Sequence, residues 1–176
     1  MDTWTSLIQG AFSDLSVPQR WADLGCGKGT FTYALGELLP SGSTVYAVDT
    51  APQILSERVG GVRVSFHQAD FEHDPLPSGD LDGVLLANAI HYVQDKESLI
   101  RKLSHYCKPS HVFLIVEYDR LTANPWVPYP VDFTTLTNLF ERAGYHRIVR
   151  LGERRSRYGG TIYAASIKKT PAITSR

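Results

Sequence analysis

The sequence predicts an α/β fold: a doubly wound, mostly parallel seven-stranded sheet with one antiparallel strand near the edge and helices on both faces, in three αβα layers. First, short apolar segments alternate five times with segments of helical apolar spacing, which is typical of parallel sheets with right-handed crossovers. Second, two strand-like segments close the chain without a helix between them, which indicates an antiparallel strand. Third, the apolar run Leu81–Ala87 is typical of a strand covered on both faces.

The first half of the chain contains a short helix and three strands with their connections. Trp4, Leu7, Ile8 and Ala11 have helical spacing and predict an amphipathic helix over Thr3–Phe12. Breaker residues (Pro, Ser and Gly) separate the segments that follow. These are a strand Arg20–Leu24, a helix Lys28–Leu39, a strand Ser43–Asp49, a helix that begins at Ala51 and ends before Gly60-Gly61, and a strand Val62–His67.

The second half continues this alternation after a proline-rich loop, His73–Asp80. The predicted segments are a strand Leu81–Ala87, a helix Asp95–Tyr106, a strand His111–Glu117, a proline- and aromatic-rich connector Tyr118–Val131, a helix Phe133–Ala143, and closing strands Tyr145–Leu151 and Thr161–Lys168. We divide the chain into an N-terminal helix packing on the core (residues 1–17), one cofactor-binding domain (18–169) and a frayed tail (170–176).

Composition excludes several classes of protein. The chain has 176 residues, 43% of them hydrophobic, enough for a core without disulfides or structural metal. Lys plus Arg and Asp plus Glu are both 18, so charge gives no support for binding nucleic acid. No apolar run approaches the roughly 20 residues that span a bilayer, and no signal-peptide pattern is present. Cys26 and Cys107 have no C-x-x-C spacing. Together these features favour a cytoplasmic protein that does not bind membranes.

Polar and glycine residues gather where the predicted strands end. Asp23 precedes the turn Gly25-Cys26-Gly27-Lys28-Gly29, where missing Cβ atoms let the backbone approach a ligand, and we expect unpaired backbone N–H groups there. Asp49 ends the second strand, about 20 residues beyond the turn, where an acid binds ribose hydroxyls. Ligands of parallel sheets bind at this edge, and the negative charge of Asp23 favours a cationic nucleoside cofactor over a pyrophosphate.

These segments resemble the motifs of the class I S-adenosylmethionine-dependent methyltransferases. Asp23–Gly29 is similar to the first motif of that family, Tyr46–Asp49 to its second-strand motif, and Gln68–Phe71 to its adenine loop. Asp82–Val93 resembles the fourth strand with the turn after it, and Lys108-Pro109 the lead-up to the fifth strand. The resemblance covers roughly residues 18–168. It implies the seven-stranded methyltransferase sheet, S-adenosylmethionine as cofactor and S-adenosylhomocysteine as product.

The resemblance also implies roles for individual residues. Asp23 would hold the amine of the cofactor, Asp49 its ribose, and Asp70 its adenine amino group. The full set of expected cofactor contacts is Asp23, Gly25, Cys26, Gly27, Asp49, Thr50, Asp70, Phe71 and Ala87. No metal ligand is predicted, because His67, Asp70 and His73 are better explained as a strand end and a loop.

The acceptor side is less defined. His91 follows the fourth strand on the ligand side and is the candidate catalytic base, because histidine exchanges protons near neutral pH. The alternative for His91 is a set of local hydrogen bonds at a helix start. Glu117 and Asp119, at the end of the fifth strand, are candidates for substrate contact or for facing solvent. The connector after that strand is a predicted lid, a packed connector or a self-association patch. The expected substrate contacts are Tyr92, Tyr118, Trp126 and Tyr129.

The sequence therefore predicts a methyltransferase that transfers a methyl group by in-line displacement to an O, N, C or S acceptor on a small molecule. No second domain is predicted to grip a macromolecule, although a homodimer would supply a larger surface. One alternative is an NAD-dependent oxidoreductase on a related sheet, disfavoured by Asp23 and by Thr30 where a third glycine would stand. The other is a non-catalytic cofactor-binding subunit.

Overall fold

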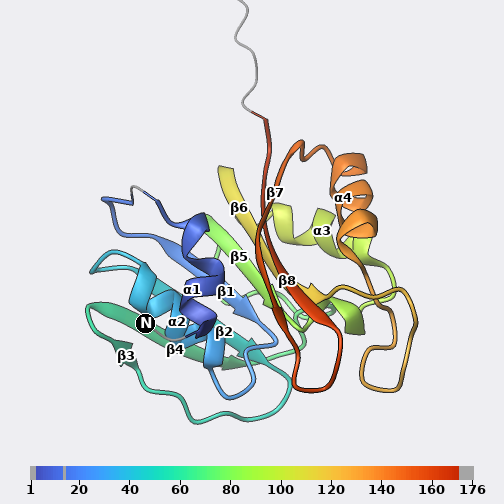
Figure 1. Ribbon diagram of the computed structural model, residues 1–176. Coiled ribbons are helices and arrows are strands. Elements are labelled where there is room, and N and C mark those ends of the chain that lie inside the picture. Colours follow the sequence, from blue (N-terminus) through green and yellow to red (C-terminus); the bar gives the residue numbers. More distant parts are fainter. Residues whose placement is uncertain (1–2, 14, 171–176) are drawn as a thin grey trace, which may run out of the picture.

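The structure, a computed structural model, describes residues 3–13 and 15–170. These residues form an eight-stranded sheet in the order β3-β4-β2-β1-β5-β6-β8-β7 with helices on both faces (Figure 1). The three-layer α/β fold predicted from the sequence is thereby confirmed. None of the helices in these residues combines the length and the apolar character needed to cross a membrane. The strands are β1 Arg20–Leu24, β2 Thr44–Asp49, β3 Arg58–Val59, β4 Val62–Gln68, β5 Leu81–Ala87, β6 Cys107–Tyr118, β7 Arg147–Arg155 and β8 Thr161–Lys168.

Five neighbouring strands, β4, β2, β1, β5 and β6, are parallel. Strand β8 runs antiparallel between β6 and β7, so the antiparallel strand near the edge is confirmed. Parallel strands end at the same edge of the sheet, and the ends of β1, β2, β4, β5 and β6 therefore lie together. This edge is where the sequence predicts a ligand.

The helices are α1 Thr3–Ile8, α2 Thr30–Leu38, α3 Lys96–Ser104 and α4 Phe133–Arg142, with short 3-10 turns η1 at Gln9–Ala11 and η2 at Ile90–Tyr92. Two helices begin at aspartate caps that their sequence supplies. Asp95 accepts a hydrogen bond from the Ser98 N–H at the start of α3, and Asp132 accepts from the Thr135 N–H at the start of α4. Such a cap contributes about 1 kcal/mol.

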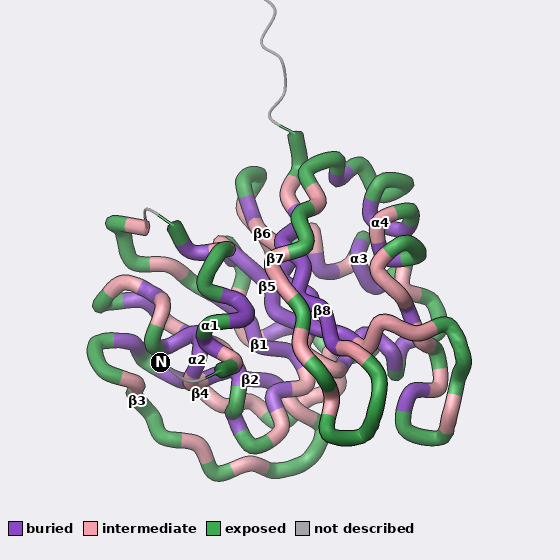
Figure 2. The backbone as a smooth tube through the Cα atoms, viewed as in Figure 1, coloured by how far each residue is buried: buried purple, intermediate pink, exposed green. Residues whose placement is uncertain are grey.

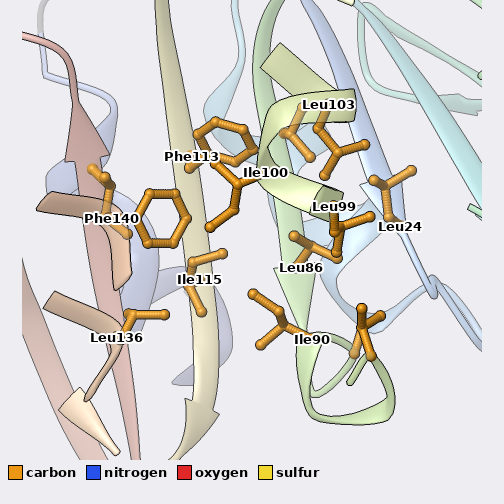
Figure 3. Packing of buried hydrophobic residues seen from close by; sticks show 14 of the residues in the cluster. Leu24, Leu86, Ile90, Leu99, Ile100, Leu103, Phe113, Ile115, Leu136 and Phe140 are labelled. Atoms are coloured by element: carbon orange, nitrogen blue, oxygen red, sulfur yellow. The ribbon is translucent and has the colours of Figure 1, made fainter. Parts of the chain in front are cut away.

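One face of the sheet is covered by α3 and α4. In Figure 3, Leu99, Ile100 and Leu103 of α3 point toward β5 and β6, and Phe140 of α4 lies beside β6. The Phe113 and Phe140 rings are 5.3 Å apart between centroids. Fully burying one such side chain contributes about 1.5–3 kcal/mol, so this cluster holds β5 and β6, whose ends carry the candidate site, in a fixed position.

The other face is covered by α1 and α2, which pack on Trp21, Val45, Leu85 and Leu114 of the sheet. Figure 2 shows the central strands buried along most of their length, whereas residues 50–57 are largely exposed. The helix predicted from Ala51 is therefore wrong: residues 50–57 are not helical. The reason is length. The eight residues must return along β2, about 20 Å for six strand residues, and a helix of eight residues would span only about 12 Å.

The predicted count of seven strands also needs a correction. The eighth strand is β3, two residues that pair antiparallel with the start of β4 through the turn at Gly60-Gly61. It forms because the chain returns from β2 in an extended conformation and meets the edge of β4. The strand and helix alternation is correspondingly less regular than predicted, because β2 is not followed by a helix, whereas the loop predicted between β4 and β5 is present.

We expect Gly83→Ala to lower the free energy of unfolding by about 1–3 kcal/mol, the usual cost of overpacking a core. Gly83 lies beside Trp21 in the β1–β5 pairing, and a Cβ at residue 83 would overlap the buried Trp21 ring. Urea unfolding of both proteins measures the difference. The matched control is Gly79→Ala, since a Cβ at residue 79 meets nothing within 4 Å. Equal losses in the two variants would contradict the prediction.

Candidate active site

The glycine turn after β1 packs closely against the loop after β5. Gly25 has φ +74°, and a Cβ at this position would lie 2.9 Å from the Ala89 Cβ and 3.6 Å from the Phe71 ring. A side chain at residue 25 would thus fill the space between the turn, the loop after β4 and the loop after β5. A Cβ at Gly27, in contrast, would meet nothing within 4 Å, so the turn is open at that position and fits a nucleoside cofactor lying across the strand ends.

Four of the five N–H groups of the turn are used within the protein, which corrects the expectation that they are unpaired. Gly25 and Cys26 donate to the Val48 carbonyl at 2.8 and 3.0 Å, and Gly29 donates to the Cys26 carbonyl at 3.0 Å. Gly27 donates to Asp49 Oδ2 at 2.8 Å. The turn is held to the end of β2 by these bonds, and its four partnered amides are not free to bind phosphate oxygens.

Asp49 is placed at the turn as predicted, at the end of β2. Its Oδ2 accepts from Gly27 and its Oδ1 accepts from the Ala51 N–H at 2.9 Å. Each carboxylate oxygen can accept more than one hydrogen bond, so the same side chain has capacity left for ribose hydroxyls. Thr50, beside it, is exposed, and its carbonyl accepts from Gln68 Nε2 at 2.9 Å.

Asp23 lies beneath the turn and is 1% exposed. Thr32 of α2 donates a hydrogen bond of 2.6 Å to Asp23 Oδ2. Burial raises the pKa of the Asp23 carboxyl to about 7, and the nearby charge of Asp49 adds to the increase, while the Thr32 bond opposes it. A carboxyl group with a pKa near neutrality at a ligand edge marks a functional candidate. It would become fully charged beside a cationic ligand.

Cys26 lies in the same turn with its side chain buried. Burial raises the pKa of its thiol to about 12, and the charges of Asp23 and Asp49 add to the increase. The thiol therefore stays protonated near neutral pH and is not a nucleophile. The role that the structure supports for Cys26 is packing next to the cofactor position.

Asp70 and Phe71 lie in the loop after β4. Asp70 Oδ2 bonds the His73 Nδ1 at 2.9 Å, and Oδ1 accepts from the Glu72 N–H at 2.9 Å. The His73 bond lowers the pKa of Asp70 and raises that of His73. Asp70, Glu72 and His73 gather their donor atoms within 4.8 Å. His67 stands apart from them and bonds Ser65 at 2.9 Å.

The loop after β5 links the glycine turn to the acceptor side. Ala87 ends β5, Ala89 touches the position of Gly25, and His91 lies in the turn η2. Between them, Asn88 adopts φ +51°, a left-handed conformation that asparagine tolerates better than most residues. The Asn88 Oδ1 is buried and has no hydrogen-bond partner among the described residues. A polar atom of this kind calls for a ligand donor.

His91 and Glu117 form a buried pair at the ends of β5 and β6. His91 Nδ1 lies 2.7 Å from Glu117 Oε1, and both side chains are almost fully buried. Glu117 Oε1 also accepts from the Tyr118 N–H at 2.8 Å. Because a carboxylate only accepts, Nδ1 carries the proton of this bond, and in the neutral imidazole Nε2 then has the lone pair. The bond holds the His91 ring in one orientation, which is the geometry that proton transfer by a histidine requires.

A cavity of about 640 Å³ lies over this pair. Its size is that of a small-molecule site. Four aromatic side chains, one arginine and two asparagines contribute to the wall, from the loops after β5 and β6 and from the β7–β8 hairpin, whose ends lie near one another in Figure 1. The lining residues are Asn88, His91, Tyr92, Tyr118, Arg120, Asn124, Trp126, Val127, Tyr158 and Gly159.

The segment 120–131 is tied to the turn that carries His91. The Tyr129 N–H donates to the His91 carbonyl at 3.0 Å, and Lys96 Nζ donates to the Tyr129 carbonyl at 2.9 Å. Of the four expected substrate contacts, Tyr92, Tyr118 and Trp126 line the cavity. The ring of Tyr129 lies instead near Lys96, with Nζ 5.7 Å from the ring centroid.

The sequence patterns did not indicate several of the residues that line the cavity. Asn88, Arg120, Asn124 and Tyr158 come from three loops that are far apart in the chain. The position of Arg120 directly after the strand end at Glu117–Asp119 is a signal that could have indicated it. Tyr158 lies at the tip of the β7–β8 hairpin, and no sequence pattern connects that tip to a strand end 40 residues earlier.

The strand order, the glycine turn after β1 and the ligand edge define the fold class of the S-adenosylmethionine-dependent methyltransferases. Residues 22–115, just over half of the chain, match the family model described as a methyltransferase domain, and the chain belongs to this family. A structure of 1,6-didemethyltoxoflavin-N1-methyltransferase from Burkholderia thailandensis, with 1,6-didemethyltoxoflavin and S-adenosylhomocysteine bound, has the same fold. Its TM-score is 0.73 at 21% identity, over 96% of this chain and 77% of that one.

Two curated relatives are similar in sequence. A probable S-adenosylmethionine-dependent methyltransferase from Mycolicibacterium smegmatis is 26% identical over 85% of this chain. Acetylserotonin O-methyltransferase from Gallus gallus is 29% identical over 76% of this chain. The chain spans 64% of the length of the first relative and 40% of the second.

Proposed function

We propose that the protein transfers a methyl group from S-adenosylmethionine to a small-molecule acceptor bound in the cavity beside His91. The observation that carries this proposal is the state of the glycine turn. Its amides at Gly25, Cys26, Gly27 and Gly29 are partnered within the protein, and the acid Asp23 lies beneath it. This arrangement suits a cationic nucleoside and disfavours a pyrophosphate.

The chain's own residues would prepare the acceptor. S-adenosylmethionine, when bound, supplies a methyl group already activated for displacement. The cavity wall would hold the acceptor in line with it, and most of the acceleration can come from this positioning. For a hydroxyl acceptor, His91 Nε2 takes the proton, and the Glu117 carboxylate stabilises the resulting imidazolium through Nδ1.

The cofactor roles of Asp23, Gly25, Cys26, Gly27, Asp49, Thr50, Asp70, Phe71 and Ala87 remain part of this proposal, as do the domain limits given above. Two free cysteines among the described residues support placement in the cytoplasm. A homodimer and the absence of nucleic-acid binding stay predictions, and gel filtration with light scattering tests the first of them.

The test is a calorimetric titration with S-adenosylhomocysteine and, separately, with NAD. We expect binding of the first only. Asp49→Ala should weaken it at least tenfold and also lower the free energy of unfolding by about 1–3 kcal/mol, because Gly27 and Ala51 lose their acceptor. Asp49→Asn, which keeps one acceptor oxygen for Gly27, is the matched control. Its affinity for S-adenosylhomocysteine and its free energy of unfolding should lie between those of the wild type and of Asp49→Ala. Tight NAD binding without a S-adenosylhomocysteine signal would overturn the proposal.

A further inference from the structure

The cavity beside His91 has a chemistry that selects its ligand. We propose that the acceptor is an aromatic hydroxy acid: a planar ring system held among the aromatic side chains, with its hydroxyl at His91 and an anionic group at Arg120. This inference rests on the proposed function and adds the class of substrate. Three independent features of the wall carry it.

The first feature is the number of rings. Tyr92, Tyr118, Trp126 and Tyr158 line the cavity, and Trp126 and Tyr158 are 75% and 82% exposed. The His91 ring lies near two of them, 4.3 Å from Tyr92 and 6.1 Å from Tyr118 between centroids. Aromatic faces favour offset or edge-to-face contact with another ring. A planar acceptor would cover this otherwise exposed aromatic surface.

The second feature is a cation that has no anionic partner among the described residues. Arg120 is the one lysine or arginine among the described residues of the cavity wall. Its Nε donates to the Thr122 carbonyl at 2.7 Å, which holds the guanidinium in place. No carboxylate of the described residues lies within salt-bridge distance of Arg120, and the neighbouring Asp119 pairs instead with Arg150 at 2.9 Å. The remaining N–H groups of Arg120 match a carboxylate.

The third feature is a pair of acceptor atoms on two residues of the cavity wall, His91 and Asn88. In the neutral imidazole, the bond from Nδ1 to Glu117 makes His91 Nε2 the acceptor nitrogen, and Asn88 Oδ1 is buried and unpartnered in the described part of the chain. Both atoms suit a ligand that donates a proton, as a hydroxyl does. A cationic amine would meet the positive charge of Arg120 in the same cavity, so an anionic acceptor is favoured.

The size of the cavity is consistent with more than one ring. A volume of about 640 Å³ lies in the middle of the range for pockets that bury small organic ligands. Fused bicyclic hydroxy acids, or a hydroxylated ring with an acidic side chain, would therefore fit better than a single phenol.

The test measures binding to protein saturated with S-adenosylhomocysteine, by the change in tryptophan fluorescence; of the three tryptophans, Trp126 is the one in the cavity wall. The probes are hydroxybenzoates, hydroxycinnamates and hydroxyquinoline carboxylates, each paired with its neutral amide. We expect at least one acid to bind about tenfold or more tightly than its amide. Arg120→Gln should remove this difference and leave the amide unchanged. The matched control is Arg157→Gln, which changes an exposed arginine of the β7–β8 hairpin outside the lining and should behave as wild type.

Two outcomes would overturn the inference while the proposed function stands. They are binding of S-adenosylhomocysteine with no acid bound more tightly than its amide, and equal effects of Arg120→Gln and Arg157→Gln. Failure of S-adenosylhomocysteine itself to bind, measured first in the same cuvette, would instead remove the proposed function and with it this inference.

Discussion

His91→Gln is expected to lower the turnover of a hydroxyl acceptor by about 10²–10⁴-fold, the usual contribution of a general base. The affinity for S-adenosylhomocysteine should not change, because His91 lines the acceptor cavity and not the glycine turn. The measurement is S-adenosylhomocysteine release under saturating cofactor, together with a calorimetric titration of the same variant. A loss in turnover without a loss in cofactor affinity separates proton transfer from cofactor binding.

Glu117→Gln distinguishes a positioning residue from a merely structural one. The glutamine oxygen can still accept from Nδ1, so the ring of His91 stays oriented, but the negative charge that stabilises the imidazolium is lost. We expect a smaller loss of turnover than for His91→Gln and a shifted pH profile. Tyr92→Phe is the matched control, since it keeps the ring beside His91. Full activity of His91→Gln would show that His91 only makes local hydrogen bonds.

Asp23→Asn is expected to stabilise the protein at pH 8 relative to wild type. The folded-state pKa of Asp23 is raised from 3.8 to about 7 by burial, so between these values the folded state binds a proton that the unfolded state has released. Stability of the wild type therefore falls as the pH rises from about 4 to about 7 and then levels off. The largest effect is on the order of 4 kcal/mol, from about three pH units at 1.36 kcal/mol each.

Urea unfolding from pH 5 to pH 8 measures this difference. The asparagine variant keeps an acceptor for Thr32 and should lose the downward slope, and parallel curves for the two proteins would contradict the prediction. A second readout concerns function. If Asp23 holds the cofactor amine, the stabilised variant should bind S-adenosylhomocysteine more weakly, whereas unchanged affinity would leave Asp23 with a structural role only.

Much of the fold could be predicted because local patterns and the final structure agree. Strands β1 and β5 have the predicted bounds, and the helices α2, α3 and α4 lie within two residues of the predicted starts and a few residues of the predicted ends. The predicted helix after Asp49 failed although Pro52 suits a first helical turn. The distance to be spanned along β2 overrode this local preference, as tertiary context often does.

The cofactor edge could be located from the sequence because Asp23, the glycine turn and Asp49 are close in sequence and follow strands whose ends must meet. The hydrogen-bond partners of the turn could not be predicted from the sequence. The Gly25 N–H binds the Val48 carbonyl because of the register between β1 and β2. No local sequence pattern encodes this register. The same limit applies to Asp23, whose raised pKa follows from burial under a helix packed against it.

For this protein, composition and strand-end motifs establish the α/β class, the ligand edge and the kind of cofactor, because these depend on short segments read in order. Folding alone brings Glu117 to His91 and places Arg120, Trp126 and Tyr158 around one cavity. These residues come from separate loops, and their distances are set by the packing of β6 and β8 in the sheet. The glycine turn therefore indicates which cofactor binds, while the assembled loops form the cavity that we propose for the acceptor.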